Sequence, residues 1–109
     1  MLFSLAGVDA KDPKDLERRS DETKKMSEQF ASEADKLEKQ AALEANKDKA
    51  EVLQEISKLR RDESEALGKL SEALRKKQWS SIRRYEKEAG QLCDKVGQQW
   101  QKLEKISAS

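Results

Sequence analysis

Few residues of this 109-residue chain have side chains suited to covalent, acid–base or metal chemistry. The sequence contains no histidine and a single cysteine, Cys93. General acid–base catalysis needs a group that exchanges protons near neutral pH, and a metal site needs a cluster of ligands. The sequence has neither pattern, and its many carboxylates lie in charged segments where they should titrate normally. We therefore expect no enzymatic activity, no catalytic or metal-binding residues and no cofactor.

Two chemically distinctive side chains fall within apolar repeats. Glu63 occupies a core position of an otherwise apolar heptad, where a polar residue sets the register by reaching a basic partner or extending to water. Gln99 has the same role further along the chain. We expect Cys93 to be a small buried hydrophobe. A reactive thiol, with its pKa lowered by the nearby Lys95, is the alternative.

The segment 74–87 has the composition of a partner-binding sequence. It contains two aromatic residues, Trp79 and Tyr85, one acidic residue and six basic residues: Arg75, Lys76, Lys77, Arg83, Arg84 and Lys87. Such a mixture can bind anionic lipid headgroups or phosphates, or can form a basic helix that inserts into a groove. The structural alternative is a helix hairpin whose cations complement a helix C-terminus and whose tryptophan packs at the end of a bundle.

Charge and cysteine usage limit the partners and the compartment. The net charge is only +1, so we expect no nucleic-acid partner, although residues 75–109 carry nine basic and four acidic groups. One cysteine excludes an internal disulfide framework and indicates a reducing compartment. The apolar stretch Met1–Val8 lacks the basic residues and the length of a signal peptide, and no segment is long enough to span a membrane. We expect a soluble, cytoplasmic protein.

The composition predicts an all-α fold. Charged residues make up 41% of the chain against about 25% in an average protein, and aromatic residues only 5%. β-Branched residues are few and there is a single proline, so the sequence suits long helices with a narrow aliphatic core. Apolar residues recur at heptad spacing over 13–45, 49–77 and 81–107, which we predict to be three helices. The predicted core comprises Phe30, Leu37, Ile56, Leu59, Leu70, Ile82, Tyr85, Leu92, Val96 and Leu103.

The first apolar stripe is thinner than the other two. Ser20, Thr23 and Ser27 dilute it, which suggests that the first helix is the least firmly held and the easiest for a partner helix to replace.

The phase of the heptad repeat distinguishes three separate helices from one long continuous helix. The positions Leu37 and Ile56, and again Leu70 and Ile82, are out of step by five residues, which fits chain reversals better than coiled-coil discontinuities. Each slip coincides with capping residues: Asp48 with Glu51 at the first, and Ser80 or Ser81 at the second. Asp12 and Pro13 predict the start of the first helix.

We therefore predict an elongated antiparallel three-helix bundle over residues 12–109, preceded by a flexible tail over residues 1–11. The bundle is expected to be monomeric. Longer helices in a dimeric coiled coil, with a second copy of the chain as the partner, are the alternative.

The length and heptad pattern of residues 13–107 resemble those of spectrin-type repeats, without a diagnostic motif. Two strings, Ala-Glu-Val-Leu-Gln-Glu at 50–55 and Tyr-Glu-Lys-Glu-Ala at 85–89, are similar to strings of the tubulin-binding cofactor A family but stand in the opposite order. That resemblance implies a small helical chaperone, and no functional residue follows from it.

The expected function is a protein-interaction module, acting as a scaffold, adaptor or assembly subunit through helix–helix contacts. Binding to an anionic membrane through segment 75–87 and Met1–Val8 is a second possibility, and a client-binding chaperone a third.

Overall fold

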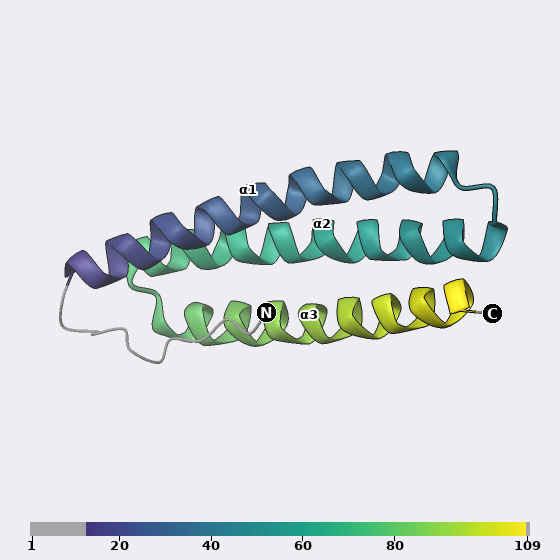
Figure 1. Cartoon of the computed structure of the whole chain (residues 1–109). Coiled ribbons are helices and arrows are strands. Elements are labelled where there is room, and N and C mark those ends of the chain that lie inside the picture. Colours follow the sequence, from purple (N-terminus) through teal and green to yellow (C-terminus); the bar gives the residue numbers. More distant parts are fainter. Residues whose placement is uncertain (1–12, 109) are drawn as a thin grey trace.

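The computed structural model describes residues 13–108, and these form three α-helices (Figure 1). The helices are α1 (Pro13–Leu43), α2 (Lys47–Lys76) and α3 (Trp79–Ala108). Within this range only residues 44–46 and 77–78 are non-helical, and no strand occurs. The rod measures 52 × 20 × 18 Å. The predicted antiparallel three-helix bundle and both chain reversals are confirmed. The predicted tail, 1–11, and the capping residue Asp12 lie outside the described residues.

Asn46, rather than Asp48, caps the N-terminus of α2 after the turn from α1. Asn46 has an extended backbone, and its side-chain oxygen accepts a hydrogen bond from the Lys49 N–H at 3.2 Å. The helix therefore starts two residues earlier than predicted, because Asn46 satisfies the open N–H group before Asp48 is reached. Asp48 instead lies in the first turn, where its charge complements the positive end of the helix dipole.

The turn between α2 and α3 consists of two residues. Lys77 adopts the left-handed conformation, with φ of 56°, and its N–H donates to the Leu74 carbonyl at 3.3 Å. The Gln78 N–H donates to the Ala73 carbonyl at 3.0 Å, which completes a Schellman motif. The Gln78 carbonyl then accepts the first hydrogen bond of α3, from the Ile82 N–H.

The prediction that Ser80 or Ser81 caps α3 is therefore wrong. Both residues lie inside the first helical turn, because α3 begins at Trp79.

Helices α1 and α2 are joined by small residues spaced seven apart on both helices. Ser20 and Ser71 each donate from the hydroxyl to the other's backbone carbonyl, at 2.7 Å in both directions. Ser27 and Ser64 form the same reciprocal pair at 2.6 Å. One heptad further, Ser57 donates to the Ala34 carbonyl at 2.7 Å. Such bonds require the two helices to approach closely, and each stabilises the fold by about 1 kcal/mol.

This packing overturns the basis for expecting a weakly held first helix. Ser20 and Thr23 are 1% and 0% exposed, so they lie in the core rather than diluting it. The Thr23 hydroxyl donates to the Arg19 carbonyl within its own helix, at 2.7 Å. These side chains are small and internally hydrogen-bonded, and for that reason α1 can lie closer to α2 than a stripe of leucines would allow.

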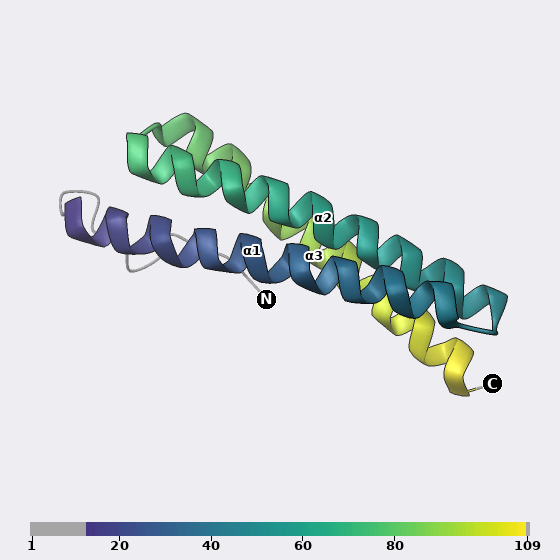
Figure 2. The same ribbon diagram turned by 90° about the horizontal axis from the view of Figure 1, so that it is seen from above.

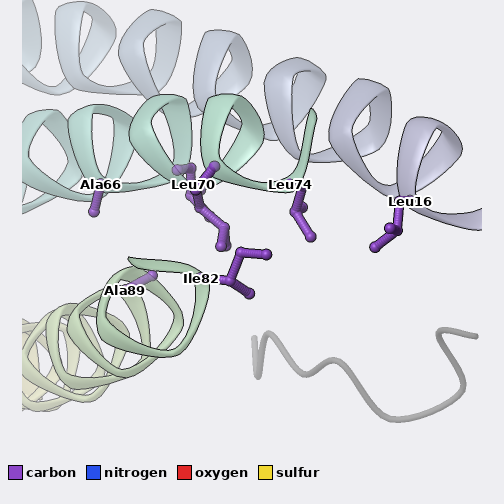
Figure 3. Close-up of a cluster of buried hydrophobic side chains, with 8 residues drawn as sticks. Leu16, Ala66, Leu70, Leu74, Ile82 and Ala89 are labelled. Carbon is purple, nitrogen blue, oxygen red and sulfur yellow. The ribbon is translucent and has the colours of Figure 1, made fainter. Parts of the chain in front are cut away.

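The apolar core consists of two clusters, one towards each end of the rod. The cluster near the α2–α3 turn includes Leu16 of α1, Leu70 and Leu74 of α2, and Ile82 of α3. Leu70 and Leu74 point towards Ile82 (Figure 3). The second cluster lies near the α1–α2 turn and includes Leu37, Ile56, Leu59 and Val96. Six predicted core residues are buried: Leu37, Ile56, Leu59, Leu70, Ile82 and Val96. The other four are half-buried against the clusters: Phe30, Tyr85, Leu92 and Leu103.

Helix α3 packs closely on α2, and its backbone lies farther from α1, although all three helices contribute side chains to both core clusters. Cα atoms of α1 and α3 nowhere come within 8 Å of each other over residues 13–108, whereas α2 meets both helices closely. In Figure 2 α3 runs obliquely behind the α1–α2 pair. The apolar face of α3 is therefore covered more closely by α2 than by α1, and this arrangement shapes the candidate site.

The close α1–α2 contact can be tested by enlarging one of its small residues. Ser20→Leu should lower the free energy of unfolding by about 3 kcal/mol, since the larger side chain overpacks the interface and removes a hydrogen bond. Ser32→Leu, at an exposed position of the same helix, is the matched control and should change it by less than about 0.5 kcal/mol. Urea denaturation measures both. Equal effects of the two substitutions would contradict the close packing.

Candidate functional site

The basic segment predicted to bind a partner is exposed at one end of the rod. All six of its cations are exposed: Arg75, Lys76, Lys77, Arg83, Arg84 and Lys87. Trp79 is 39% exposed at the first residue of α3. Tyr85 is half-buried beneath two cations, with Arg84 at 5.5 Å and Lys69 at 5.9 Å from its ring centroid. The segment therefore offers positive charge and one aromatic side chain to an anionic surface.

A second feature, the aromatic edge, runs along α3 beside its buried stripe. We define it as Trp79, Glu86, Cys93 and Trp100, spaced seven residues apart. The buried stripe of α3, Ile82, Ala89 and Val96, keeps the same spacing, so the edge stays on one side of the helix. Trp100 is 37% exposed, while Glu86 and Cys93 are half-buried. Two large aromatic side chains are thus left open along one line.

The aromatic edge lies on the side of α3 that faces α1. A hollow beside Trp100 is lined by Leu103 and Ser107 of α3, by Leu53 and Lys49 of α2, and by three residues at the end of α1: Gln40, Leu43 and Glu44. Leu43 is 87% exposed at the rim of this hollow. The sequence alone gave no sign of Leu43, whose exposure follows from its position as the last residue of α1.

Next to the aromatic edge, Gly90 and Gly97 leave a strip of α3 without side chains. A methyl group added at either glycine would meet no atom within 4 Å. Gly68 differs, because a methyl group there would lie 3.5 Å from the Ser27 hydroxyl of α1. The glycines of α3 therefore face open space, where a helix interior normally favours alanine by about 1 kcal/mol per residue.

A buried ion pair separates the two apolar clusters at the middle of the rod. Glu63 is 2% exposed, and its carboxylate accepts a hydrogen bond from Arg60 Nη1 at 2.8 Å. Arg60 Nε lies 3.4 Å from the Glu33 carboxylate, and the guanidinium is 4.5 Å from the Phe30 ring centroid. Glu63 therefore reaches a basic partner, which was one of the two roles predicted for it. Gln99 is half-buried and lines a groove between α2 and α3.

The environment of Glu63 changes its protonation. Burial raises the pKa of the Glu63 carboxyl above its ordinary value of 4.5, and the neighbouring Arg60 guanidinium offsets this rise only in part. Desolvation is thus stronger than the attraction of the single cation. Arg60 Nη1 bonds the Glu63 carboxylate and Arg60 Nε faces Glu33, so we interpret these three side chains as a structural layer.

No group of three or more cysteine or carboxylate side chains among residues 13–108 could hold a metal ion. No helix within the same residues combines the length and the apolar character needed to cross a membrane.

Comparisons of the chain with protein-family models, with curated proteins and with solved structures find no significant match.

The cost of the buried ion pair can be tested by removing one or both charges. Arg60→Leu leaves the Glu63 carboxylate buried without its closest cation, and should lower the free energy of unfolding by about 3 kcal/mol at pH 7. The double variant Arg60→Leu/Glu63→Leu removes both charges, and its free energy of unfolding should equal or exceed that of the wild type. Arg61, which pairs with Asp35 and Glu38 at the surface, is the control; Arg61→Leu should cost less than about 1 kcal/mol. A double variant less stable than Arg60→Leu would contradict this account.

The raised pKa of Glu63 also predicts a pH dependence. The folded protein binds the Glu63 proton more tightly than the unfolded chain does, so protonation favours folding. The contribution of Glu63 to the free energy of unfolding is fully present below pH 4.5, and is lost as the pH rises through the raised pKa. Between pH 7 and 4.5 the wild type should therefore gain stability relative to Glu63→Gln. Denaturant titrations at several pH values measure this, and the opposite slope would show that the pKa is lowered.

Proposed function

We propose that this protein is a non-enzymatic protein-interaction module that binds its partner along the aromatic edge of α3. The observation that carries the proposal is the incomplete cover of α3: its backbone lies close to α2 but nowhere within 8 Å of the α1 backbone, and Trp79 and Trp100 remain exposed on one line. A scaffold, adaptor or assembly subunit needs such an exposed aromatic surface, whereas a protein without a partner does not.

The chemistry of the edge supports a protein as the partner. Tryptophan is enriched among the residues that supply most of the energy at protein interfaces, because it buries a large rigid area. The hollow beside Trp100, with Leu53 as part of its lining and Leu43 at its rim, can accept an apolar side chain. Polar groups border it, in the arrangement of an apolar centre and a polar rim that is common at interfaces. A cytoplasmic location is consistent with the single cysteine.

The exposed basic segment favours a second candidate, which is binding to an anionic membrane surface. Six exposed cations beside Trp79 are able to attract anionic headgroups at short range. The apolar stretch Met1–Val8, which was expected to assist insertion, lies outside the described residues.

The two candidates depend on different side chains, and matched variants separate them. Trp79→Ala/Trp100→Ala removes the aromatic edge, whereas Lys76→Ala/Lys77→Ala/Arg84→Ala removes charge from the basic segment. Quantitative affinity capture from an extract of the source cells should recover partner proteins at least tenfold less with the tryptophan variant, and equally with the charge variant. Circular dichroism checks that both variants remain folded.

Liposome co-sedimentation tests the membrane alternative. Binding that rises with phosphatidylserine content, falls with salt and disappears in the charge variant would support it. Capture that is indifferent to the tryptophans would contradict the protein-interaction proposal.

A further inference from the structure

We propose that the partner of the aromatic edge is a second copy of this chain, in a twofold-symmetric dimer whose two α3 helices lie antiparallel and cross at Gly90. This inference rests on the proposed function, because it names the partner of the same surface. It concerns two complete three-helix rods, in contrast to the long-helix coiled coil that the fold has excluded.

The spacing of the aromatic edge is self-complementary about Gly90. In a twofold antiparallel pair, a residue a given number of positions before the axis faces the residue equally far beyond it. Trp79 lies eleven positions before Gly90 and Trp100 ten positions after it. Trp79 of each copy would therefore meet Trp100 and the adjoining hollow of the other. Glu86 would face Cys93, so no two carboxylates of the edge oppose each other.

Charged side chains on the other side of the Gly90–Gly97 strip follow the same twofold symmetry. Lys87 lies three positions before Gly90 and Asp94 four positions after it, and both side chains are exposed. The pairing that brings the tryptophans together would thus place Lys87 of each copy beside Asp94 of the other. Opposite charges recur on both sides of the axis, and the antiparallel helix dipoles are also favourable.

The centre of the proposed contact has room for a second helix. Gly90 would face its own copy at the axis, and Gly97 would face Arg83, whose long side chain needs the space that a glycine leaves. Because added methyl groups at both glycines meet nothing within 4 Å, this strip is open in the single rod. The glycines alone do not identify a partner, but they allow the approach that the tryptophans and charges require.

The size of the face sets the expected affinity. Trp79 and Trp100 are about 30 Å apart along α3, at 1.5 Å per residue, on a rod 20 Å wide. The face thus offers on the order of 600 Å² per copy, somewhat below a standard stable interface. We therefore expect a dimer with a Kd of about 1–50 µM rather than a permanent assembly.

Charge exchange gives the sharpest test, since these surface residues do not contribute to the core. Lys87→Asp alone, or Asp94→Lys alone, places like charges together twice in the dimer. Sedimentation velocity of the full chain from about 1 to 200 µM should show at least tenfold weaker association for each single variant. The double variant Lys87→Asp/Asp94→Lys should return the Kd to within about threefold of the wild type. Residues seven apart on one helix are two turns apart, so this rescue has no source within a single copy.

A cysteine placed at the axis tests the register independently. In a Cys93→Ser background, Gly90→Cys should form a disulfide-linked dimer under mild oxidation, because a disulfide needs Cβ atoms within about 4.5 Å. Gln91→Cys in the same background is the control: this position is exposed on the same helix, but points about 100° away around it. It should remain largely uncross-linked.

Several outcomes would overturn the dimer. A chain that stays monomeric to about 200 µM would do so, as would association that survives both single charge variants, or equal cross-linking at positions 90 and 91. If the dimer fails while capture of another protein still depends on Trp79 and Trp100, the proposed function stands with a different partner. If the edge is instead covered by residues 1–12 of the same chain, both the dimer and the tryptophan-dependent capture fail.

Discussion

The close contact of α1 with α2 determines the rest of the structure. Ser20, Ser27, Ser64 and Ser71 are small enough for the two backbones to approach, and polar enough to join them by reciprocal hydrogen bonds. A hydroxyl that bonds a carbonyl of the neighbouring helix fixes both the distance and the relative rotation of the pair, whereas a leucine would fix neither so narrowly. The larger apolar side chains therefore lie on one side of the α1–α2 pair, and α3 packs against that side.

The position of α3 follows from that close pair. The α1–α2 pair presents its apolar side chains mainly from α2, so α3 settles against α2 and keeps its distance from α1. The large aromatic residues of α3 lie along the edge that this arrangement leaves open. The candidate site is consequently a result of the way the core is filled, and it lies on a rigid helix rather than on a loop. Both tryptophans are held in position before any partner arrives, which limits the entropy lost on binding.

The sequence was sufficient for the class of fold, for the number of helices and for most of the core. Periodic leucines and isoleucines such as Leu37, Ile56 and Leu70 identify the buried faces, and the phase slips locate the reversals. Two features were misread for physical reasons. A serine in a helix scores as polar whether it faces water or bonds a neighbouring carbonyl, so Ser20 was taken for dilution. Asn46 and Asp48 are both good caps, and only the backbone conformation of Asn46 decides between them.

The candidate site was predicted only in part. Runs of lysine and arginine are visible in any sequence, and the basic segment was therefore found. The aromatic edge depends on the rotation of α3 around α2, because the same tryptophans would be more deeply buried if α3 approached α1 more closely. Heptad spacing shows which face of a helix is apolar but not how many neighbours cover it. The hollow at Leu43 depends in addition on where α1 ends relative to α3, which local sequence does not encode.

The contacts of Arg60 with α1 favour one alignment of α1 against α2. Small residues recur every seven positions on both α1 and α2, so sliding one helix by a heptad would still place a small residue opposite a small one, for example Ser27 opposite Ser57. An interface built from a repeat cannot by itself distinguish these alignments. In the shifted alignment Arg60 would leave Glu33 and Phe30, and the Glu63 carboxylate would remain buried among different neighbours. The contacts of Arg60 with Glu33 and Phe30 of α1, rather than the Arg60–Glu63 pair within α2, therefore distinguish the observed alignment from the shifted one.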